Sequence, residues 1–476
     1  MADEATVRAR LEKVGQGHLL AFADELSAGD RAALVEQIDG LELEAMPGLI
    51  EKYVKHDTPV EIPGDLEPAA YYPHDPASSL RSWDEEAARA AGEALLKAGK
   101  VACFVVAGGQ GSRLGYDGPK GCYPTGAVTD KSLFQIFAEQ IKAAGTRYGK
   151  VVPWYIMTSP LNHEATVGFF EEHGYFGLDK GDVMFFQQGV MPSVGLDGRI
   201  LLAEKGKVAT NPDGHGGSLK ALVKSGATAD MKKRGVEHIS YFQVDNPHVH
   251  PVDPVFLGLH ASAVDSSGEM SSKMLPKAEA KEKVGVFCQS GGKTMVIEYS
   301  DMPDALSEKT DGDGNLAFNA GSIAIHAMSV AFVEKLANDP EFELPYHRAN
   351  KKVAHIDVDT GEAVSPESPN AVKMERFVFD AIPLAQGSIV YETDRVEEFA
   401  PVKNKEGVDS IVTSKQLQTE RAARWLEAAG VSVPRKADGT PDCMLEIKAT
   451  TALFADDLRG ASGLPESIEA GAAVEL

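Results

Sequence analysis

Short apolar runs alternate with amphipathic stretches from residue 100 to about residue 333. The runs VACFVVAG (101–108), VPWYIMTS (152–159), DVMFFQQG (182–189) and HISYFQVDN (238–246) have the length and apolar content of buried strands. Strands that alternate with helices build a mostly parallel sheet, which is covered on both faces and binds ligands at the carboxyl ends of its strands. The pattern therefore predicts an α/β fold.

Two further runs, VGVFCQS (284–290) and TMVIEYS (294–300), follow each other too closely for a helix to lie between them. Gly291 and Gly292 separate them, and short glycine-containing connections between strands are typical of β-hairpins. The sheet is therefore predicted to be mixed, with this hairpin as an antiparallel part.

The segments outside this region have other patterns. Apolar residues recur at helical spacing from Thr6 to about Lys55, and Asp30 has the position of a helix N-cap. A proline-bearing connector (58–78) and a second amphipathic stretch (83–99) follow, and beyond residue 401 one helical pattern precedes a weakly patterned tail. We predict three parts: an N-terminal helical arm with its connector (1–99), a core (100–400) and a small C-terminal domain (401–476).

The charge of the chain limits its partners. The 476 residues carry a formal net charge of −24, from 47 basic and 71 acidic residues. Such a charge repels nucleic acid and anionic membranes, so neither is expected as a partner. No run approaches ~18 uninterrupted apolar residues, and the start MADEATVRARLEKVGQ lacks the pattern of a signal peptide, so we expect a cytoplasmic protein. A polyanionic ligand must then be held by a few cations, metal ions and backbone N–H groups.

The stretch FVVAGGQGSRLGYDGPKG (104–121) places six glycines, one arginine and one lysine directly after an apolar run. Glycines after a strand allow a sharp turn and bring N–H groups against phosphate oxygens, and the terminus of a following helix adds a favourable dipole. The stretch is called the glycine-rich loop below, and it predicts a nucleotide site.

Three kinds of nucleotide loop and a ligand-free tight turn compete as interpretations. A P-loop requires GxxxxGK[ST], but Lys120 is followed by Gly121 instead of a hydroxyl residue. A dinucleotide fingerprint requires GxGxxG, but Leu114 occupies the position of the third glycine. In an NTP-dependent nucleotidyltransferase, a Gly-Gly pair faces the base and ribose, an arginine grips the triphosphate and a distal lysine reaches the attacked phosphorus. Arg113 and Lys120 fit these needs.

Candidate ligands for a metal or a base follow other strand-like runs. Asp245 ends ISYFQV, so its carboxylate is expected at the edge of the sheet where magnesium would bridge phosphates. His248 and His250 are not expected as ligands, because magnesium prefers oxygen, and Asp253 is expected to open a helix. The amide of Gln188 can pair with a uracil edge. The four cysteines lack CxxC spacing and are expected to pack as small apolar residues: Cys103, Cys122, Cys288 and Cys443.

These motifs resemble those of the UDP-N-acetylhexosamine pyrophosphorylases, which belong to the broader UDP-sugar pyrophosphorylase group. The glycine-rich loop is similar to the signature of that family, and the resemblance covers nearly the whole chain up to about Pro434. It implies a Rossmann-like nucleotidyltransferase core with a mostly parallel mixed sheet, an N-terminal helical arm and a small C-terminal domain. The likeness continues through FFQQGVMPSV (185–194), PDGHGG (212–217), YFQVDN (241–246), VGVFC (284–288), FNAGSIAIH (318–326), KMERFVFD (373–380) and EEFAPVKN (397–404).

The resemblance also implies a set of site residues. Catalysis is expected from Arg113, Lys120 and Lys403, with Asp245 as the magnesium ligand. Lys373 and Arg376 are weaker candidates, on a stretch (370–380) that we predict to be a helix. Nucleotide binding is expected at Val106, Ala107, Gly108, Gly109, Gln188, Gly214 and Asp245, and sugar binding at His215, Glu298, Tyr299, Asn319 and Gly321.

The implied reaction converts UTP and an N-acetylhexosamine 1-phosphate, foremost GlcNAc-1-P, into the UDP-sugar and pyrophosphate with Mg²⁺. We expect a monomer. His215 stands where the family commonly has asparagine and where UDP-glucose relatives often have histidine, so UDP-glucose or UDP-galactose synthesis is an alternative. A non-catalytic UDP-sugar sensor is another, although a sensor needs no cations such as Arg113, Lys120 and Lys403 at a developing charge.

Overall fold

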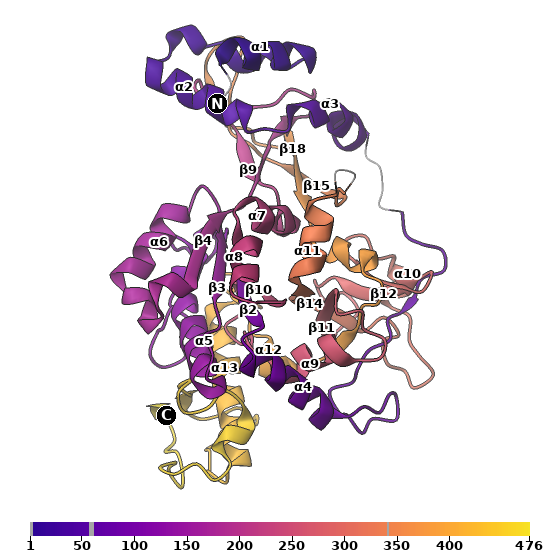
Figure 1. Cartoon of the computed structure of the whole chain (residues 1–476), viewed down its shortest axis with the longest axis vertical. Helices are drawn as coiled ribbons and strands as arrows, with labels where there is room; N and C mark the ends of the chain where they lie inside the picture. The colour runs from indigo at the N-terminus through magenta and orange to yellow at the C-terminus, as the bar shows by residue number, and fades with distance from the viewer. Residues whose placement is uncertain (1–2, 57–60, 340–341) are drawn as a thin grey trace. The chain divides into compact units, whose positions relative to one another are not determined.

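The computed structural model describes residues 3–56, 61–339 and 342–476, so the start of the predicted connector, 58–60, lies outside the described residues. The chain forms two compact units. Unit 1 comprises residues 1–61, 188–218 and 343–380, and unit 2 comprises residues 62–187, 219–342 and 381–476. In Figure 1 the indigo helices α1 to α3 belong to unit 1, and the labelled strands β2, β3, β4 and β10 belong to unit 2. The predicted boundaries near residues 99 and 400 stay a prediction.

Unit 2 contains the predicted α/β sheet. Its four parallel strands are β2 (Val101–Val106), β3 (Trp154–Thr158), β4 (Val183–Gln187) and β10 (His238–Gln243). The main path through the sheet is β1-β12-β14-β10-β2-β3-β4, and the long strand β14 (Ala320–Ser329) pairs antiparallel with β10. The prediction of a mostly parallel sheet with an antiparallel part is thus confirmed at these strands.

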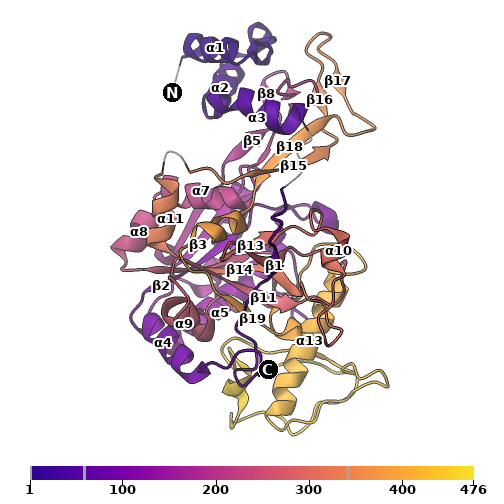
Figure 2. The same cartoon turned by 90° about the vertical axis from the view of Figure 1, so that its right-hand side faces the viewer.

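Helices cover both faces of this sheet. Figure 2 shows α4, α5 and α9 on one side of the strands, and α7, α8 and α11 on the other. Apolar side chains from α5, such as Phe134 and Phe137, join those of β2 and β3 in one buried cluster. The helices of unit 2 are α4 (Glu85–Lys97), α5 (Leu133–Tyr148), α6 (His163–Glu172), α7 (Ser218–Lys224), α8 (Ala227–Lys233), α9 (Pro254–Ser262), α10 (Asp304–Ser307), α11 (Val330–Ala337), α12 (Arg395–Glu398) and α13 (Ile411–Ala428).

Helices α4 and α9 touch each other through their backbones. A Cβ atom added at Gly92 would lie 1.8 Å from the carbonyl oxygen of Pro254, and one added at Gly258 would lie 1.7 Å from that of Ala88. No side chain fits at either position. The two glycines therefore set how closely these helices approach.

The antiparallel part of the sheet includes the predicted hairpin. Strand β12 (Val286–Ser290) pairs in register with β13 (Lys293–Ile297), and both connecting residues, Gly291 and Gly292, have positive φ angles. The hairpin prediction is confirmed. Three more strands complete the sheet: β1 (Glu67–Pro68), β11 (Met270–Pro276) and β19 (Val390–Glu392).

Within the described residues, unit 1 joins the N-terminal helices to three small sheets, β15-β18-β6, β17-β16-β7-β8 and β5-β9. A separate apolar cluster, with Leu11, Ile38, Val194 and Met374 among its members, fills its interior. Its helices are α1 (Glu4–Lys13), α2 (Ala28–Asp39) and α3 (Met46–Leu49). Its strands are β5 (Val190–Pro192), β6 (Val194–Gly195), β7 (Leu202–Glu204), β8 (Lys207–Val208), β9 (Thr210–Pro212), β15 (Tyr346–Lys351), β16 (His355–Ile356), β17 (Ala363–Val364) and β18 (Ala371–Arg376).

Two local predictions in unit 1 were wrong. The stretch 370–380 contains strand β18, not a helix, because it pairs along its length with β15. The N-cap of α2 is Ser27, whose hydroxyl accepts the backbone N–H of Asp30 at 3.2 Å. Asp30 lies in the first turn instead, where its negative charge still interacts favourably with the helix dipole.

The C-terminal segment of unit 2 has a small core of its own. Trp425 and Leu426 of α13 pack with residues such as Leu445 and Leu458 from the tail. Two short parallel strands, β20 (Met444–Glu446) and β21 (Ala473–Glu475), close this part, which is drawn in yellow in Figure 2. The three tryptophans of the chain, Trp83, Trp154 and Trp425, all lie in unit 2.

Among the described residues, the helices are all too short or too polar to cross a membrane.

Candidate active site

The glycine-rich loop begins where β2 ends. Ala107 still donates its N–H to Met157 at 2.8 Å, which keeps the chain in the sheet for one more residue. The side-chain amide of Asn162 then donates to the carbonyl oxygens of Ala107 at 2.9 Å and Gly109 at 3.2 Å. In the described part of the chain, the N–H groups of Gly108 and Gly109 have no acceptor. The carbonyl groups of Ala107 and Gly109 are thus occupied, and the N–H groups of Gly108 and Gly109 are available, as anion binding requires.

The rest of the loop is held by its own backbone. Gly111 donates to Gly118 at 2.9 Å, and Lys120 donates to Gly109 at 3.0 Å. Two glycines are required for packing, since a Cβ at Gly111 would lie 2.7 Å from the ring of Tyr116 and one at Gly121 would lie 2.2 Å from that of Phe134. The fold alone therefore explains part of the glycine content.

No α-helix follows the loop directly, so the expected dipole contribution is wrong. Only two short 3₁₀ turns, Ser112–Leu114 and Lys120–Cys122, lie within it. The next α-helix, α5, begins at Leu133 with Ser132 as its N-cap. Any positive potential in the loop must come from backbone N–H groups and cations.

Both predicted cations of the loop are available to a ligand. Arg113 is exposed and Lys120 is half-buried. Among the described residues, neither side chain forms an ion pair or hydrogen bond, although carboxylates outnumber cations in this chain. Cys122, beside them, is buried, and burial raises the pKa of its thiol to about 12, which fits a packing role.

The sheet brings Asp245 to the same edge as the glycine-rich loop. Strands β10 and β2 run parallel with Gln243 opposite Val106, and Val244 donates its N–H to Val106 at 3.2 Å. Asp245 is the next residue along the chain. Its half-buried carboxylate makes no hydrogen bond or ion pair within the described ranges.

Lys403 lies on a segment that is bonded to Asp245. The backbone N–H of Val402 donates to the carbonyl oxygen of Asp245 at 2.8 Å. The neighbouring Asn246 donates to the carbonyl of Glu398 at 2.6 Å and accepts from the N–H of Ala400 at 3.0 Å. These bonds hold Asp245 and Lys403 beside each other.

The ammonium group of Lys403 has one carboxylate partner nearby. Its Nζ lies 3.8 Å from Oδ2 of Asp409 and 5.3 Å from the ring centre of Phe399. Burial raises the pKa of Asp409, while Lys403 counteracts that shift. The lysine charge is therefore only partly compensated.

The four predicted sugar residues in unit 2 lie on or beside β13 and β14. Val286 of β12 pairs with both Ile297 and Gly321, which brings Glu298 and Gly321 to the same region. A Cβ at Gly321 would lie 3.0 Å from Val284, so packing against the chain itself accounts for this glycine. Burial raises the pKa of Tyr71, and the nearby side chain of Asn319 counteracts that shift. Tyr299 is 48% exposed.

The three other predicted residues lie in unit 1. Gln188 is buried, and Gly214 has a φ of +85° with no room for a side chain, since its Cβ would lie 2.4 Å from the carbonyl oxygen of Arg376. His215 accepts the N–H of Val378 on Nδ1 at 3.1 Å and stacks on Phe377 with ring centres 5.1 Å apart. The structure therefore assembles the predicted residues as two groups, each within its own unit.

The environment of His215 keeps its imidazole neutral. Burial lowers its pKa to about 4, and the charge of His347 acts in the same direction. Because Nδ1 accepts a hydrogen bond from the backbone, the neutral ring carries its proton on Nε2. His215 thus offers a single donor, where an asparagine side chain offers both a donor and an acceptor.

Comparison with known proteins places the chain in a family. The family model described as UTP--glucose-1-phosphate uridylyltransferase matches residues 69–429. The chain belongs to this family. UDP-N-acetylhexosamine pyrophosphorylase-like protein 1 of Xenopus tropicalis is 36% identical over 95% of this chain and 92% of its own length. UDP-N-acetylglucosamine pyrophosphorylase of Saccharomyces cerevisiae is 35% identical over 88% and 91%.

Solved structures agree with this membership of the uridylyltransferase family. The crystal structure of the uridine diphosphate N-acetylglucosamine pyrophosphorylase from Trypanosoma brucei in complex with inhibitor is 25% identical, with a TM-score of 0.80, and covers 100% of this chain and 98% of that one. The predicted fold class is confirmed. As a member of this family, the chain is a nucleotidyltransferase.

The uridylyltransferase site contains few groups that could hold a metal. Within the residues that the structure describes, no three His, Cys, Asp or Glu side chains cluster as metal ligands. Asp253 accepts two backbone N–H groups as the N-cap of α9, as predicted, and also pairs with the buried Lys273. His248 is fully buried, and burial holds its pKa well below its usual range. Asp245 is left as a lone carboxylate oxygen donor.

Sequence reasoning missed two contributors to the site. Asn162 holds the glycine-rich loop, and its place just after β3, at the same sheet edge, was a usable signal. The second is His347, whose Nε2 lies 2.8 Å from Oδ2 of Asp380 while its ring stacks on Phe377 with centres 4.1 Å apart. Nothing in the local sequence around His347 pointed to this contact.

Proposed function

We propose that the chain transfers the uridylyl group of UTP to an N-acetylhexosamine 1-phosphate, GlcNAc-1-P foremost, and releases pyrophosphate. One observation carries the proposal: within the described residues, the amides of Gly108 and Gly109 are unoccupied at the sheet edge that Asp245 shares, and Arg113 and Lys120 of the same loop form no ion pair. The names of the relatives support the choice of sugar.

In the proposed reaction, the phosphate oxygen of the sugar 1-phosphate attacks the α-phosphorus of UTP in line, and pyrophosphate leaves. No covalent enzyme intermediate forms. The protein contributes alignment and charge neutralisation, which are the main needs of nucleotidyl transfer. The amides of Gly108 and Gly109 bind the nucleotide, Arg113 grips the triphosphate, and Lys120 and Lys403 neutralise the charge that develops around the α-phosphorus.

Magnesium fits this site through Asp245. Mg²⁺ is commonly held by one or two carboxylates together with substrate phosphates, and the side chain of Asp245 is an uncommitted oxygen donor among the described residues. When bound, the ion would supply additional neutralisation of phosphate charge. The protein residues would then orient the triphosphate between this carboxylate and the cations.

The remaining predicted residues are proposed to recognise the uridine and the sugar. Gln188 and Gly214 are assigned to the base and its ribose. The donor on Nε2 of His215, together with Glu298, Tyr299, Asn319 and Gly321, is assigned to sugar binding. His215 also favours a second candidate, UDP-glucose or UDP-galactose synthesis.

A panel of substrates tests the proposal. Purified protein is given UTP, Mg²⁺ and, in turn, GlcNAc-1-P, GalNAc-1-P, Glc-1-P or Gal-1-P, and pyrophosphate release is measured. We expect the highest kcat/KM with GlcNAc-1-P. Highest activity with Glc-1-P or Gal-1-P would favour the second candidate. Binding of UDP-sugar without turnover of any sugar phosphate would show a sensor and contradict the enzyme proposal.

We further propose that the protein acts as a monomer in the cytoplasm. Light scattering during size-exclusion chromatography would give the mass of the assembly, and cell fractionation would give the compartment.

A further inference from the structure

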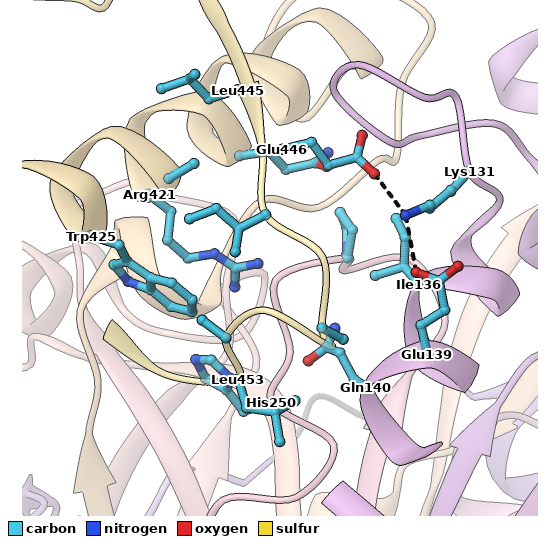
Figure 3. Close-up of a pocket in the computed structure, with 16 residues that line it drawn as sticks. Lys131, Ile136, Glu139, Gln140, His250, Arg421, Trp425, Leu445, Glu446 and Leu453 are labelled. Carbon is cyan, nitrogen blue, oxygen red and sulfur yellow. Dashed lines mark ion pairs between the residues drawn. The ribbon is translucent and has the colours of Figure 1, made fainter. Parts of the chain in front are cut away.

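A small pocket of about 70 Å³ lies away from the glycine-rich loop, among α5, α13, the loop after β10 and the C-terminal tail. All of its walls belong to unit 2. Figure 3 shows Arg421 of α13 with its guanidinium group directed into this pocket, with Gln140 of α5 across from it and His250 beside it. A volume of this size accommodates two or more water molecules or one small ion.

Arg421 uses only part of its hydrogen-bonding capacity. Its Nη1 donates to the carbonyl oxygens of His248 at 3.1 Å and Glu397 at 3.0 Å. Within the described residues, Nε and Nη2 have no acceptor, and the guanidinium forms no ion pair. The edge left over presents two parallel N–H groups, the geometry that binds a carboxylate or phosphate through two oxygens.

Arg421 is half-buried, so its guanidinium is partly desolvated. Desolvation lowers the pKa of Arg421, and the nearby carboxylates of Glu397 and Glu398 offset this only in part. Glu397 is itself occupied, because its Oε2 accepts the indole N–H of Trp425 at 2.8 Å.

Two neutral groups complete the wall. The side-chain amide of Gln140 has no hydrogen bond among the described residues. The ring nitrogens of His250 likewise have no partner there, and burial lowers the pKa of His250 to about 4, so the ring is neutral. Both side chains can donate a hydrogen bond to an anion.

The carboxylates on the opposite wall share one cation, Lys131. Lys131 lies 3.0 Å from Glu139 and 3.4 Å from Glu446, as the dashed lines in Figure 3 mark. Glu446 also accepts the N–H groups of Val128 and Thr129 at 2.9 and 3.0 Å. Among the described residues, Arg421 is the cation of this pocket that forms no ion pair, and its guanidinium carbon lies 5.3 Å from the ring centre of Trp425.

We propose that this pocket binds a small oxyanion, which pairs through two oxygens with Nε and Nη2 of Arg421 and accepts a hydrogen bond from Gln140. Inorganic phosphate and a short carboxylate share this chemistry. The pocket wall includes Pro247, two residues from Asp245, so the oxyanion would lie beside the loop that carries this carboxylate.

The test follows thermal stability and calorimetric binding during titration of the full chain with phosphate or with formate, with chloride keeping the ionic strength constant. The variant Arg421→Gln removes the charged donor. Arg424→Gln is the matched control, since Arg424 lies on the same helix but pairs with Asp394 and Glu420 at the surface. Phosphate that binds at the glycine-rich loop should bind equally well to both variants. The difference in phosphate binding between the two variants therefore measures binding at the Arg421 pocket.

We expect saturable binding in the native chain and in Arg424→Gln, and binding weakened roughly tenfold or more in Arg421→Gln. Binding of phosphate alone would identify a tetrahedral ligand, and binding of formate a carboxylate ligand. If Arg421→Gln does not fold, Gln140→Leu decides, because it removes one donor without a buried charge and should weaken binding severalfold. Unchanged binding in the variants, or no saturable binding of either salt, would overturn the proposal.

Discussion

Lys403 is the cation of the proposed site whose surroundings give the sharpest test. Its only carboxylate neighbour among the described ion pairs, Asp409, lies 3.8 Å away, so its charge is available to phosphates. We expect Lys403→Ala to lower kcat roughly 10²- to 10³-fold, as removal of one preorganised charge-stabilising group does. Lys405→Ala, two residues further along the same loop and exposed, serves as the control. Comparable rates for the two variants would remove Lys403 from the mechanism.

His260 links the protein's stability to pH. It is fully buried, its Nδ1 lies 2.9 Å from Oγ of Ser271, and burial lowers its pKa to about 3. An unfolded histidine has a pKa of about 6.5, so the unfolded chain binds a proton that the native chain does not. The free energy of unfolding should therefore fall as pH drops from about 6.5 towards 3.

We predict that His260→Gln removes about one proton from this linkage. Urea unfolding at a series of pH values should show a slope smaller by up to about 1.4 kcal/mol per pH unit in the variant, although His215 and His250 keep their share. At alkaline pH the two curves should run parallel. Equal slopes between about pH 4 and 6 would contradict this account of His260.

Single residues also show where sequence information ends. The place of Asp245 could be predicted, because a strand end fixes the sheet edge at which a residue lies. The stack of His215, Phe377 and His347 could not, since it depends on contacts between distant parts of the chain. The sequence predicted that the glycines of the loop bind phosphate, but it did not show that Gly111 and Gly121 are also needed for packing.

The contact between α4 and α9 gives a prediction about helix packing. Replacing Gly92 by alanine puts a methyl group 1.8 Å from the backbone of Pro254, so the helices must separate. We expect a loss of about 1–3 kcal/mol in the free energy of unfolding. Gly168→Ala in α6 is the control: nothing lies within 4 Å of its Cβ position, and the change should stabilise the helix by about 0.5–1 kcal/mol. Denaturant unfolding of both variants decides.

The elements that were predicted correctly share a simple cause. Strands β2, β3 and β10 are apolar on both faces because helices cover the sheet, and such runs stand out from their surroundings. Strand β18 alternates partly exposed charges with buried residues, as half-buried strands do, but one of its buried residues is itself charged, which obscures the pattern in the sequence. Arg376 is 5% exposed, with its guanidinium bonded to the hydroxyl of Tyr346.

The two compact units lead to a prediction about unfolding. Each has its own apolar interior, and unit 1 is built from the N-terminal segment and two insertions, 188–218 and 343–380, into unit 2. Unit 2 can therefore keep its sheet after unit 1 has melted. Single-transition behaviour is typical of small single domains and is not expected here.

We predict that thermal unfolding followed by far-ultraviolet circular dichroism begins at a lower temperature than unfolding followed by tryptophan emission. Circular dichroism detects the helices of both units, whereas Trp83, Trp154 and Trp425 lie in unit 2. Coincident curves would mean that the units unfold as one, and the early phase would then be absent.

The placement of the tryptophans also determines how ligand binding can be observed. A titration that relies on native emission will report on unit 2, where all three tryptophans lie. Substituting tryptophan for Phe379, whose ring centre lies 5.9 Å from that of His215, would place a fluorescent reporter beside His215. With that variant, changes around His215 in unit 1 and changes in unit 2 could be timed separately within one turnover.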